Sequence, residues 1–95
     1  MRECVIHGAA IHDWDELYDR LASELALPEW FGRNLDALYD CLTDLSDAQI
    51  TVYGWNRLVE VLGGKSKALY RVLTQAGLEN PGLVVSLLEE QDDEI

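Results

Sequence analysis

Three aspartates recur at intervals of four residues in the segment 27–44, LPEWFGRNLDALYDCLTD. They are Asp36, Asp40 and Asp44. Residues four apart lie on one face of an α-helix, so this spacing stacks three carboxylates in a row with no basic residue between them. Like charges at that spacing cost an isolated helix about 0.2–0.5 kcal/mol per pair. The row therefore predicts either a solvated helix face or a surface that binds a cationic partner.

Helix electrostatics explain only part of this row. Asp36 falls in the first turn of the expected helix, where a negative charge complements the helix macrodipole. Asp40 falls in the second turn, and Asp44 falls near the C-terminus, where a negative charge is unfavourable. Judged from the row alone, a solvated face and a binding site are equally good interpretations.

Aromatic residues lie beside the row in the sequence. Trp30 and Phe31 precede the helix, and Tyr39 falls between the acidic row and the apolar stripe of the helix, which predicts a half-exposed ring. Aromatic anchors around charges that a partner can desolvate are typical of protein-binding hot spots. The alternative is that Trp30 and Phe31 simply close one end of the core.

Enzyme chemistry has less support. The sequence contains no phosphate-binding glycine motif, metal-ligand cluster or nucleophile elbow. His7 and His12 are expected to straddle a strand end and a turn, which disfavours a metal site. Acid–base catalysis by two carboxylates requires two different environments, whereas Asp36 and Asp40 are expected in similar, exposed ones. We predict no enzymatic activity and no cofactor.

The composition limits the kinds of partner and the cellular compartment that we expect. The 95 residues include 18 acidic and 7 basic side chains, giving a net charge of -11. This balance argues against nucleic acid and anionic membrane surfaces, and it favours a cationic partner or simple solubility. Cys4 and Cys41 are too few for a disulfide framework, and we expect both to be reduced and buried, with Cys41 inert beside its acidic neighbours. Reduced thiols, with no signal-peptide pattern and no apolar run of membrane-spanning length, predict a cytoplasmic protein.

Alternating strand and helix patterns predict a single domain over 1–88, followed by an acidic tail over 89–95. Strands are expected at 3–7, 49–53 and 83–88. Helices are expected from 14 to about 26, at 35–45, at 56–62, and from Ser66 to a stop at Gly77 with Tyr70 in its apolar stripe. The order βααβααβ predicts an α/β fold with a small three-stranded parallel sheet and right-handed helical crossovers, covered on one or both faces.

Local signals predict how the helices begin. Asp13 is the expected N-cap of the first helix, and Glu16 three residues later predicts a capping box. Asn34 is the expected N-cap of the helix that carries the acidic row. In the loop before it, Gly32 is expected to supply a backbone shape that other residues resist.

The segment 24–44, ELALPEWFGRNLDALYDCLTD, resembles the barstar family, the intracellular inhibitors of small secreted bacterial ribonucleases. The agreement comprises Leu-Pro-Glu, an aromatic pair, a glycine, Asn-Leu-Asp-Ala-Leu, a further aromatic residue and Asp-Cys-Leu-Thr. It extends more loosely over residues 3–88, and the order of strands and helices agrees. The resemblance implies a barstar-like fold.

The resemblance also implies that the helix 35–45 and its preceding loop plug a ribonuclease active site. An aspartate that enters such a site accepts charge-assisted hydrogen bonds where the substrate phosphate would sit. By position in the motif, Asp40 corresponds to this phosphate mimic and Asp36 to a second acidic contact. The other partner-binding positions are Trp30, Gly32, Asn34, Tyr39, Thr43 and Asp44.

The implied partner is a small basic ribonuclease of the extracellular type. It would be bound in a 1:1 complex without a cofactor, by a protein that is monomeric when free. Two other interpretations stay open at this point. One is a domain of the same fold that serves as an adaptor for a different basic protein. The other, ranked lower, is an enzyme that uses Asp36 and Asp40.

Overall fold

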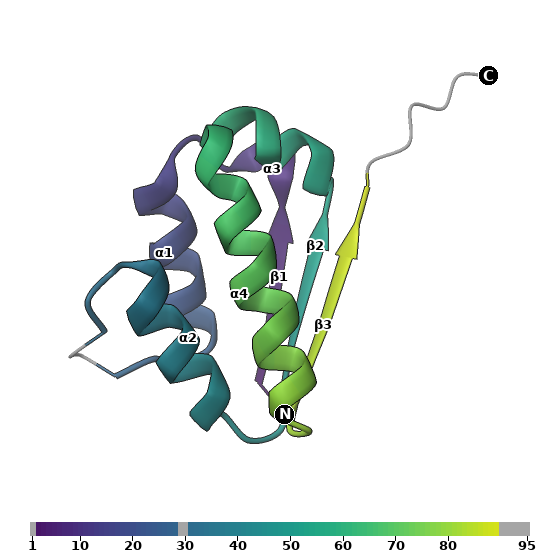
Figure 1. The fold of residues 1–95 in the computed structure, drawn as a ribbon. Coiled ribbons are helices and arrows are strands. Elements are labelled where there is room, and N and C mark those ends of the chain that lie inside the picture. Colours follow the sequence, from purple (N-terminus) through teal and green to yellow (C-terminus); the bar gives the residue numbers. More distant parts are fainter. Residues whose placement is uncertain (1, 29–30, 90–95) are drawn as a thin grey trace.

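The computed structural model describes residues 2–28 and 31–89. Within them, three strands and four α-helices follow the predicted order βααβααβ (Figure 1). Two short 3-10 helices, η1 and η2, follow β1 and α3. The elements are β1 (Arg2–His7), η1 (Gly8–Ala10), α1 (Trp14–Glu24), α2 (Leu35–Asp44), β2 (Ala48–Tyr53), α3 (Trp55–Leu62), η2 (Gly63–Lys65), α4 (Ser66–Glu79) and β3 (Leu83–Leu88).

The three strands form one parallel sheet in the order β1-β2-β3. Ala48, at the start of the central strand, pairs with Arg2 of β1 on one side and with Leu83 of β3 on the other. Parallel neighbours need long crossovers, and here each crossover contains two α-helices. The predicted α/β class and parallel sheet are therefore confirmed.

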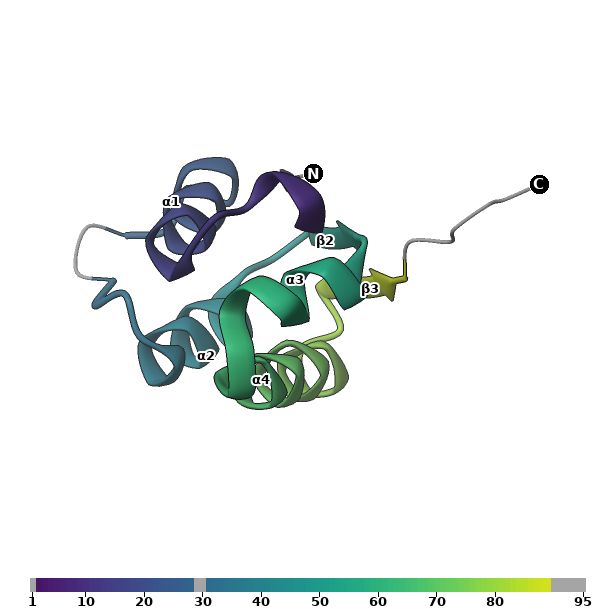
Figure 2. The ribbon, with the colours of Figure 1, turned by 90° about the horizontal axis from the view of Figure 1, so that it is seen from above.

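All four α-helices lie on one face of the sheet, as the two perpendicular views show (Figure 1, Figure 2). Alternate residues of β2, such as Ile50 and Val52, belong to the core between sheet and helices. Residues of the opposite parity belong to the uncovered face, where Tyr53 and Val84 are half exposed. Of the two arrangements left open by the sequence, the structure has the helices on a single face.

Both cysteines lie in the core, one on β1 and one on α2. Cys4 and Cys41 are free thiols and are buried, which confirms their predicted placement. Burial raises the pKa of Cys4 to about 12, and Glu24 adds to this effect. Phe31 is also buried, so it closes the core as one of the two interpretations predicted. Trp30 lies outside the described residues.

The start of α1 follows the predicted cap but not the full capping box. Asp13 accepts a hydrogen bond from the backbone N–H of Glu16 at 2.9 Å. The Glu16 carboxylate, however, accepts from the backbone N–H of His12 at 2.8 Å and not from that of Asp13. Glu16 therefore binds the backbone of His12, the residue before the N-cap, where the capping box predicts a bond to the N-cap residue itself.

The predicted stop of α4 at Gly77 is wrong, because the helix continues to Glu79. A β-carbon at Gly77 would lie 3.4 Å from Cγ2 of Val85 on β3, an ordinary contact, so this glycine lies within the helix where α4 packs on the sheet. Tyr70 is also misplaced by the prediction. It lies outside the apolar stripe, is 49% exposed and packs against Trp55 with the ring centroids 5.8 Å apart.

No helix within residues 2–28 and 31–89 is long and apolar enough to cross a membrane. Residues 90–95 lie outside the described part of the chain. The division into a domain over 1–88 and an acidic tail over 89–95 therefore stays a prediction.

Candidate functional site

The position of α2 is fixed at its start by a side-chain cap. Asn34 has an extended backbone, and its Oδ1 accepts a hydrogen bond from the N–H of Ala37 at 2.8 Å. The same side chain donates from Nδ2 to the carbonyl of Gly32 at 3.2 Å. On the inner face of the helix, Leu38 and Leu42 are fully buried. Cap and core together determine which face of α2 is presented to solvent.

The far end of α2 is held by a residue of α4's C-terminal turn. Asn80 donates from Nδ2 to the carbonyl of Leu42 at 2.9 Å and to that of Leu45 at 2.7 Å. The Leu42 carbonyl also accepts from the N–H of Leu45 at 3.4 Å, so Asn80 adds to the hydrogen bonding of the last turn of α2. No local pattern predicts this link, because it depends on α2 and α4 lying side by side.

The solvent face of α2 carries the acidic row, defined here as Asp36, Asp40 and Asp44. All three residues are exposed. In the described part of the chain, none of their carboxylates forms an ion pair with a basic side chain. The structure therefore brings the three predicted carboxylates together on one accessible surface, where their charges are uncompensated.

Tyr39 joins the acidic row to α4. Its side chain is half-buried, and its hydroxyl donates a hydrogen bond to the Glu79 carboxylate, which also accepts from Nε2 of Gln75 at 2.9 Å. The bond between the two raises the pKa of Tyr39 and lowers the pKa of Glu79. Glu79 thus adds a negative charge beside the row. Sequence reasoning missed it, since only the tertiary packing of α2 on α4 brings it there.

Basic side chains lie near one end of the row. A groove of about 410 Å³ between α2 and α4 is lined by both Asp36 and Arg71. A cavity of about 570 Å³ beside the start of α2 is lined by both Asp36 and Lys65. Asp40 and Asp44 line neither of them. Asp36 thus shares both hollows with basic side chains, whereas Asp40 shares neither.

The remaining predicted contacts have mixed outcomes. Thr43 is half-buried and donates from Oγ1 to the carbonyl of Asp40 at 3.0 Å. Gly32 is exposed, but the left-handed backbone expected of it belongs to Arg33, with a φ of 55°. A β-carbon at Gly32 would lie 3.1 Å from Nδ2 of Asn34, so the glycine leaves room for the capping side chain. Trp30 cannot be placed, since it lies outside the described residues.

The histidines considered as metal ligands and the cysteine considered as a nucleophile have other surroundings in the structure. His7 stacks on Tyr53 with the ring centroids 5.4 Å apart, and His12 lies 3.0 Å from the Glu16 carboxylate. Among the described residues, no three potential ligands are grouped to hold a metal ion. The pKa of Cys41 is raised by burial and by the nearby aspartates of the row, which opposes thiolate formation.

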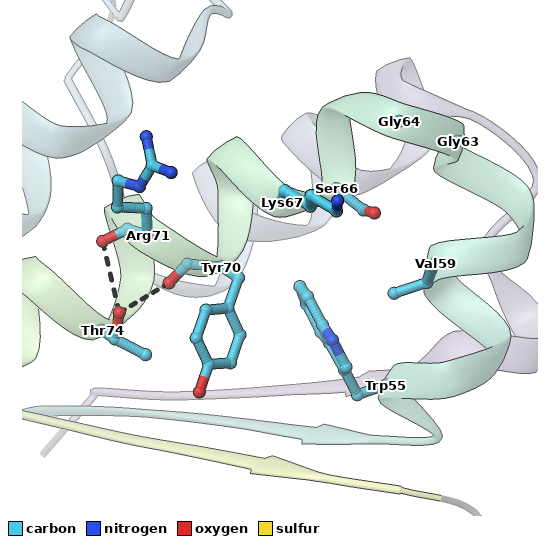
Figure 3. Close-up of a pocket in the computed structure, with 9 residues that line it drawn as sticks. All are labelled: Trp55, Val59, Gly63, Gly64, Ser66, Lys67, Tyr70, Arg71 and Thr74. Atoms are coloured by element: carbon cyan, nitrogen blue, oxygen red, sulfur yellow. Dashed lines mark hydrogen bonds between the residues drawn. The ribbon is translucent and has the colours of Figure 1, made fainter.

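A larger cavity of about 720 Å³ lies between α3 and α4 (Figure 3). The rings of Trp55 and Tyr70 extend side by side into this region, whereas the guanidinium of Arg71 extends away from them. Lysine, serine and threonine supply its other polar side chains, and no carboxylate, imidazole or thiol lines it. The described lining of the cavity therefore lacks a carboxylate or imidazole base beside its serine or lysine, of the kind that activates a catalytic nucleophile by accepting its hydrogen bond.

Comparison with known proteins agrees with this geometry. Residues 1–90 match the family model of Barstar (barnase inhibitor). A relative from Bacillus subtilis (strain 168), named "Putative ribonuclease inhibitor YrdF", is 42% identical over 52 residues. This match covers 55% of the chain and 57% of the relative, so the chain spans little more than half of that protein's length. Both matches point to an inhibitor rather than an enzyme. The match over residues 1–90, with the observed order of strands and helices, shows that the chain belongs to the barstar family.

Proposed function

We propose that this protein inhibits a small basic ribonuclease by binding to its active site in a 1:1 complex. The observation that carries the proposal is the acidic row: three exposed carboxylates that form no ion pair with a basic side chain among the described residues, on a helix fixed at both ends. Membership of the barstar family and the name of the relative support the same role.

The chemistry of the target explains why carboxylates would bind there. A ribonuclease must hold a phosphodiester, so its site presents cationic hydrogen-bond donors. Asp40, in the second turn of α2, would accept charge-assisted hydrogen bonds at the phosphate position, and Asp36 would form a second acidic contact. Trp30, Gly32, Asn34, Tyr39, Thr43 and Asp44 would surround these two carboxylates. No bond is made or broken, because inhibition follows from occupation of the site.

The same proposal accounts for the repulsion within α2. In the free protein, the cap of Asn34 and the buried leucines offset the cost of three like charges. In the complex, cationic groups of the ribonuclease would replace the missing counter-charges. A row that is unfavourable in isolation thereby becomes favourable at the interface.

The test is a titration of barnase activity on a fluorogenic RNA substrate. We expect the wild-type protein to abolish cleavage at one equivalent. Asp40→Asn should weaken inhibition about 30- to 5,000-fold, the equivalent of about 2–5 kcal/mol for one partner of a buried charge pair. Glu3→Gln makes the same change of charge on the uncovered face of the sheet and should leave inhibition nearly unchanged.

Two results would contradict the proposal. One is the absence of inhibition by the wild-type protein against barnase and against the basic ribonucleases of its own source. The other is an Asp40→Asn variant that inhibits as tightly as the wild type. Capture of a different basic protein, without inhibition of any ribonuclease, would instead support the adaptor role.

A further inference from the structure

The residue before the cap of α2 has an unusual backbone. Arg33 has a φ of 55°, in the left-handed region that side chains with a β-carbon rarely adopt. The residue lies directly between Gly32 and the capping Asn34. Other contacts of Arg33 must therefore compensate for an unfavourable conformation at the entrance to α2.

The Arg33 side chain supplies these contacts, and all of them are made to α1. Nη1 donates to Oδ1 of Asp19 at 2.9 Å, and Nη2 donates to the backbone carbonyl of Asp15 at 3.0 Å. Nη2 also lies 3.5 Å from Oδ1 of Asp15. The guanidinium carbon lies 5.9 Å from the centre of the Tyr18 ring, within the range of a cation–π contact. One side chain thus joins the entrance of α2 to three residues of α1.

The neighbouring residues show what this contact adds. Phe31 is buried and meets Tyr18 edge-on, with the ring centroids 5.8 Å apart. Asn34 is tied into the first turn of α2. Between these two anchors, Gly32 and Arg33 are exposed. Asn34 holds the Gly32 carbonyl at 3.2 Å, and the Arg33 guanidinium joins this part of the segment 31–34 to α1.

The charge of Arg33 also needs an explanation. An arginine beside a surface that meets a basic partner would repel that partner, unless its charge were neutralised. Asp15 and Asp19 provide this neutralisation within the chain itself. The arrangement suits an internal clamp rather than a contact with the partner.

We propose that Arg33 is a positioning residue, which holds the segment 31–34 against α1 before the partner arrives. The inference rests on the proposed inhibitory function. A segment that is already ordered loses less conformational freedom on binding, so preorganisation increases affinity without adding a contact. Arg33 would thereby present the start of α2 and its acidic row in the binding geometry.

Removal of the Arg33 side chain distinguishes this positioning role from electrostatic steering, because the two predict opposite changes in binding to a basic ribonuclease. Arg33→Ala makes the protein more negative, so steering alone predicts faster association with a basic ribonuclease. The clamp predicts the opposite: affinity for barnase about two- to fivefold weaker, in the range of exposed ion pairs. Lys67→Ala removes the same charge from an exposed site on α4 and should not weaken binding.

Two further variants distinguish the geometry of the contact from its charge. Arg33→Lys keeps the charge but loses the forked donor pair, so its affinity should lie between those of the wild type and Arg33→Ala. Asp19→Ala removes one acceptor of the Arg33 guanidinium. In the double variant with Arg33→Ala, the two losses should not add, because both changes break the same contact.

The deciding measurement in the free protein is amide hydrogen exchange. Arg33→Ala should increase exchange at residues 32–35 while the melting temperature changes by only a few degrees. Unchanged exchange overturns the clamp even if barnase proves not to be the partner. Where the wild type does bind, an Arg33→Ala variant that binds equally well or more tightly overturns it too.

Discussion

At Asp40, the stability of the helix and the proposed binding to a basic ribonuclease favour different side chains. The residue lies beyond the first turn of α2, between the like charges Asp36 and Asp44, and no described basic side chain pairs with it. Its carboxylate therefore contributes nothing to the helix that a neutral side chain could not. Asp36 differs, because its place in the first turn favours a negative charge.

This difference predicts separate effects on stability. Asp40→Ala should leave the free energy of unfolding unchanged, or raise it by a few tenths of a kcal/mol, because it removes two repulsive pairs. Asp36→Ala should lose about 0.3–1 kcal/mol through the helix macrodipole. Urea unfolding of both variants measures these values. A loss above about 1 kcal/mol for Asp40→Ala would show that the residue serves folding.

Cys4 predicts a dependence of stability on alkaline pH. Burial raises the pKa of its thiol from 9.0 to about 12, so the folded protein holds this proton after the unfolded chain has released it. The resulting stabilisation is fully present below pH 9 and is lost as pH rises towards 12. Unfolding free energies between pH 8 and 11 should therefore fall less steeply for Cys4→Ala than for the wild type. Equal slopes would contradict the assignment.

At the scale of the elements, the sequence predicted α2 well and its surroundings poorly. Asn34 as the cap, the buried leucines and the exposed aspartates all follow from local spacing, which a helix converts directly into faces. The bond between Tyr39 and Glu79 and the contacts of Asn80 with α2 were not predictable. They depend on α2 packing against α4, which no local pattern encodes.

Two wrong predictions, the end of α4 and the position of the left-handed backbone before α2, have the same origin. Gly77 was expected to end α4, since glycine commonly follows a helix. In the structure it lies within the helix and meets the side chain of Val85 on β3. Arg33, rather than Gly32, takes the left-handed backbone because its side chain is anchored on α1. In both cases tertiary contacts override local propensity.

Two glycines should respond oppositely to the same substitution. At Gly8, a β-carbon would lie 2.1 Å from the carbonyl oxygen of Gly54, a backbone atom that cannot move aside. Gly8→Ala should therefore destabilise the protein by about 1–3 kcal/mol or more. At Gly77, the β-carbon would make an ordinary contact and improve helix propensity, so Gly77→Ala should be neutral or stabilise by up to about 1 kcal/mol.

Urea unfolding compares the two glycine variants directly. Tolerance of alanine at Gly8 would mean that η1 and the start of α3 are less tightly apposed than described. Marked destabilisation by Gly77→Ala would mean that the contact with Val85 cannot relax by a few tenths of an ångström.

At the scale of the whole molecule, charge is the property that bears most on function. The net charge of -11 is large for 95 residues. Several basic side chains are neutralised internally: Arg20 pairs with Glu24, and Arg33 pairs with two aspartates. The acidic row and Glu79 lie together on one side, on α2 and the end of α4. A basic protein approaching this side would be attracted before any contact forms.

This distribution predicts how association depends on salt. The rate constant for association with a basic ribonuclease should fall markedly between low and physiological ionic strength, because screening shortens to about 10 Å at 0.1 M. The dissociation rate should change much less, since contacts in a closed interface are poorly screened. Stopped-flow mixing at a series of salt concentrations measures the first rate, and displacement by excess unlabelled inhibitor measures the second. Asp44→Asn should reduce the salt dependence more than Glu3→Gln, because only the former lies on the surface proposed to face the partner. An association rate indifferent to salt would remove steering from the mechanism and leave the acidic row to act by contact alone.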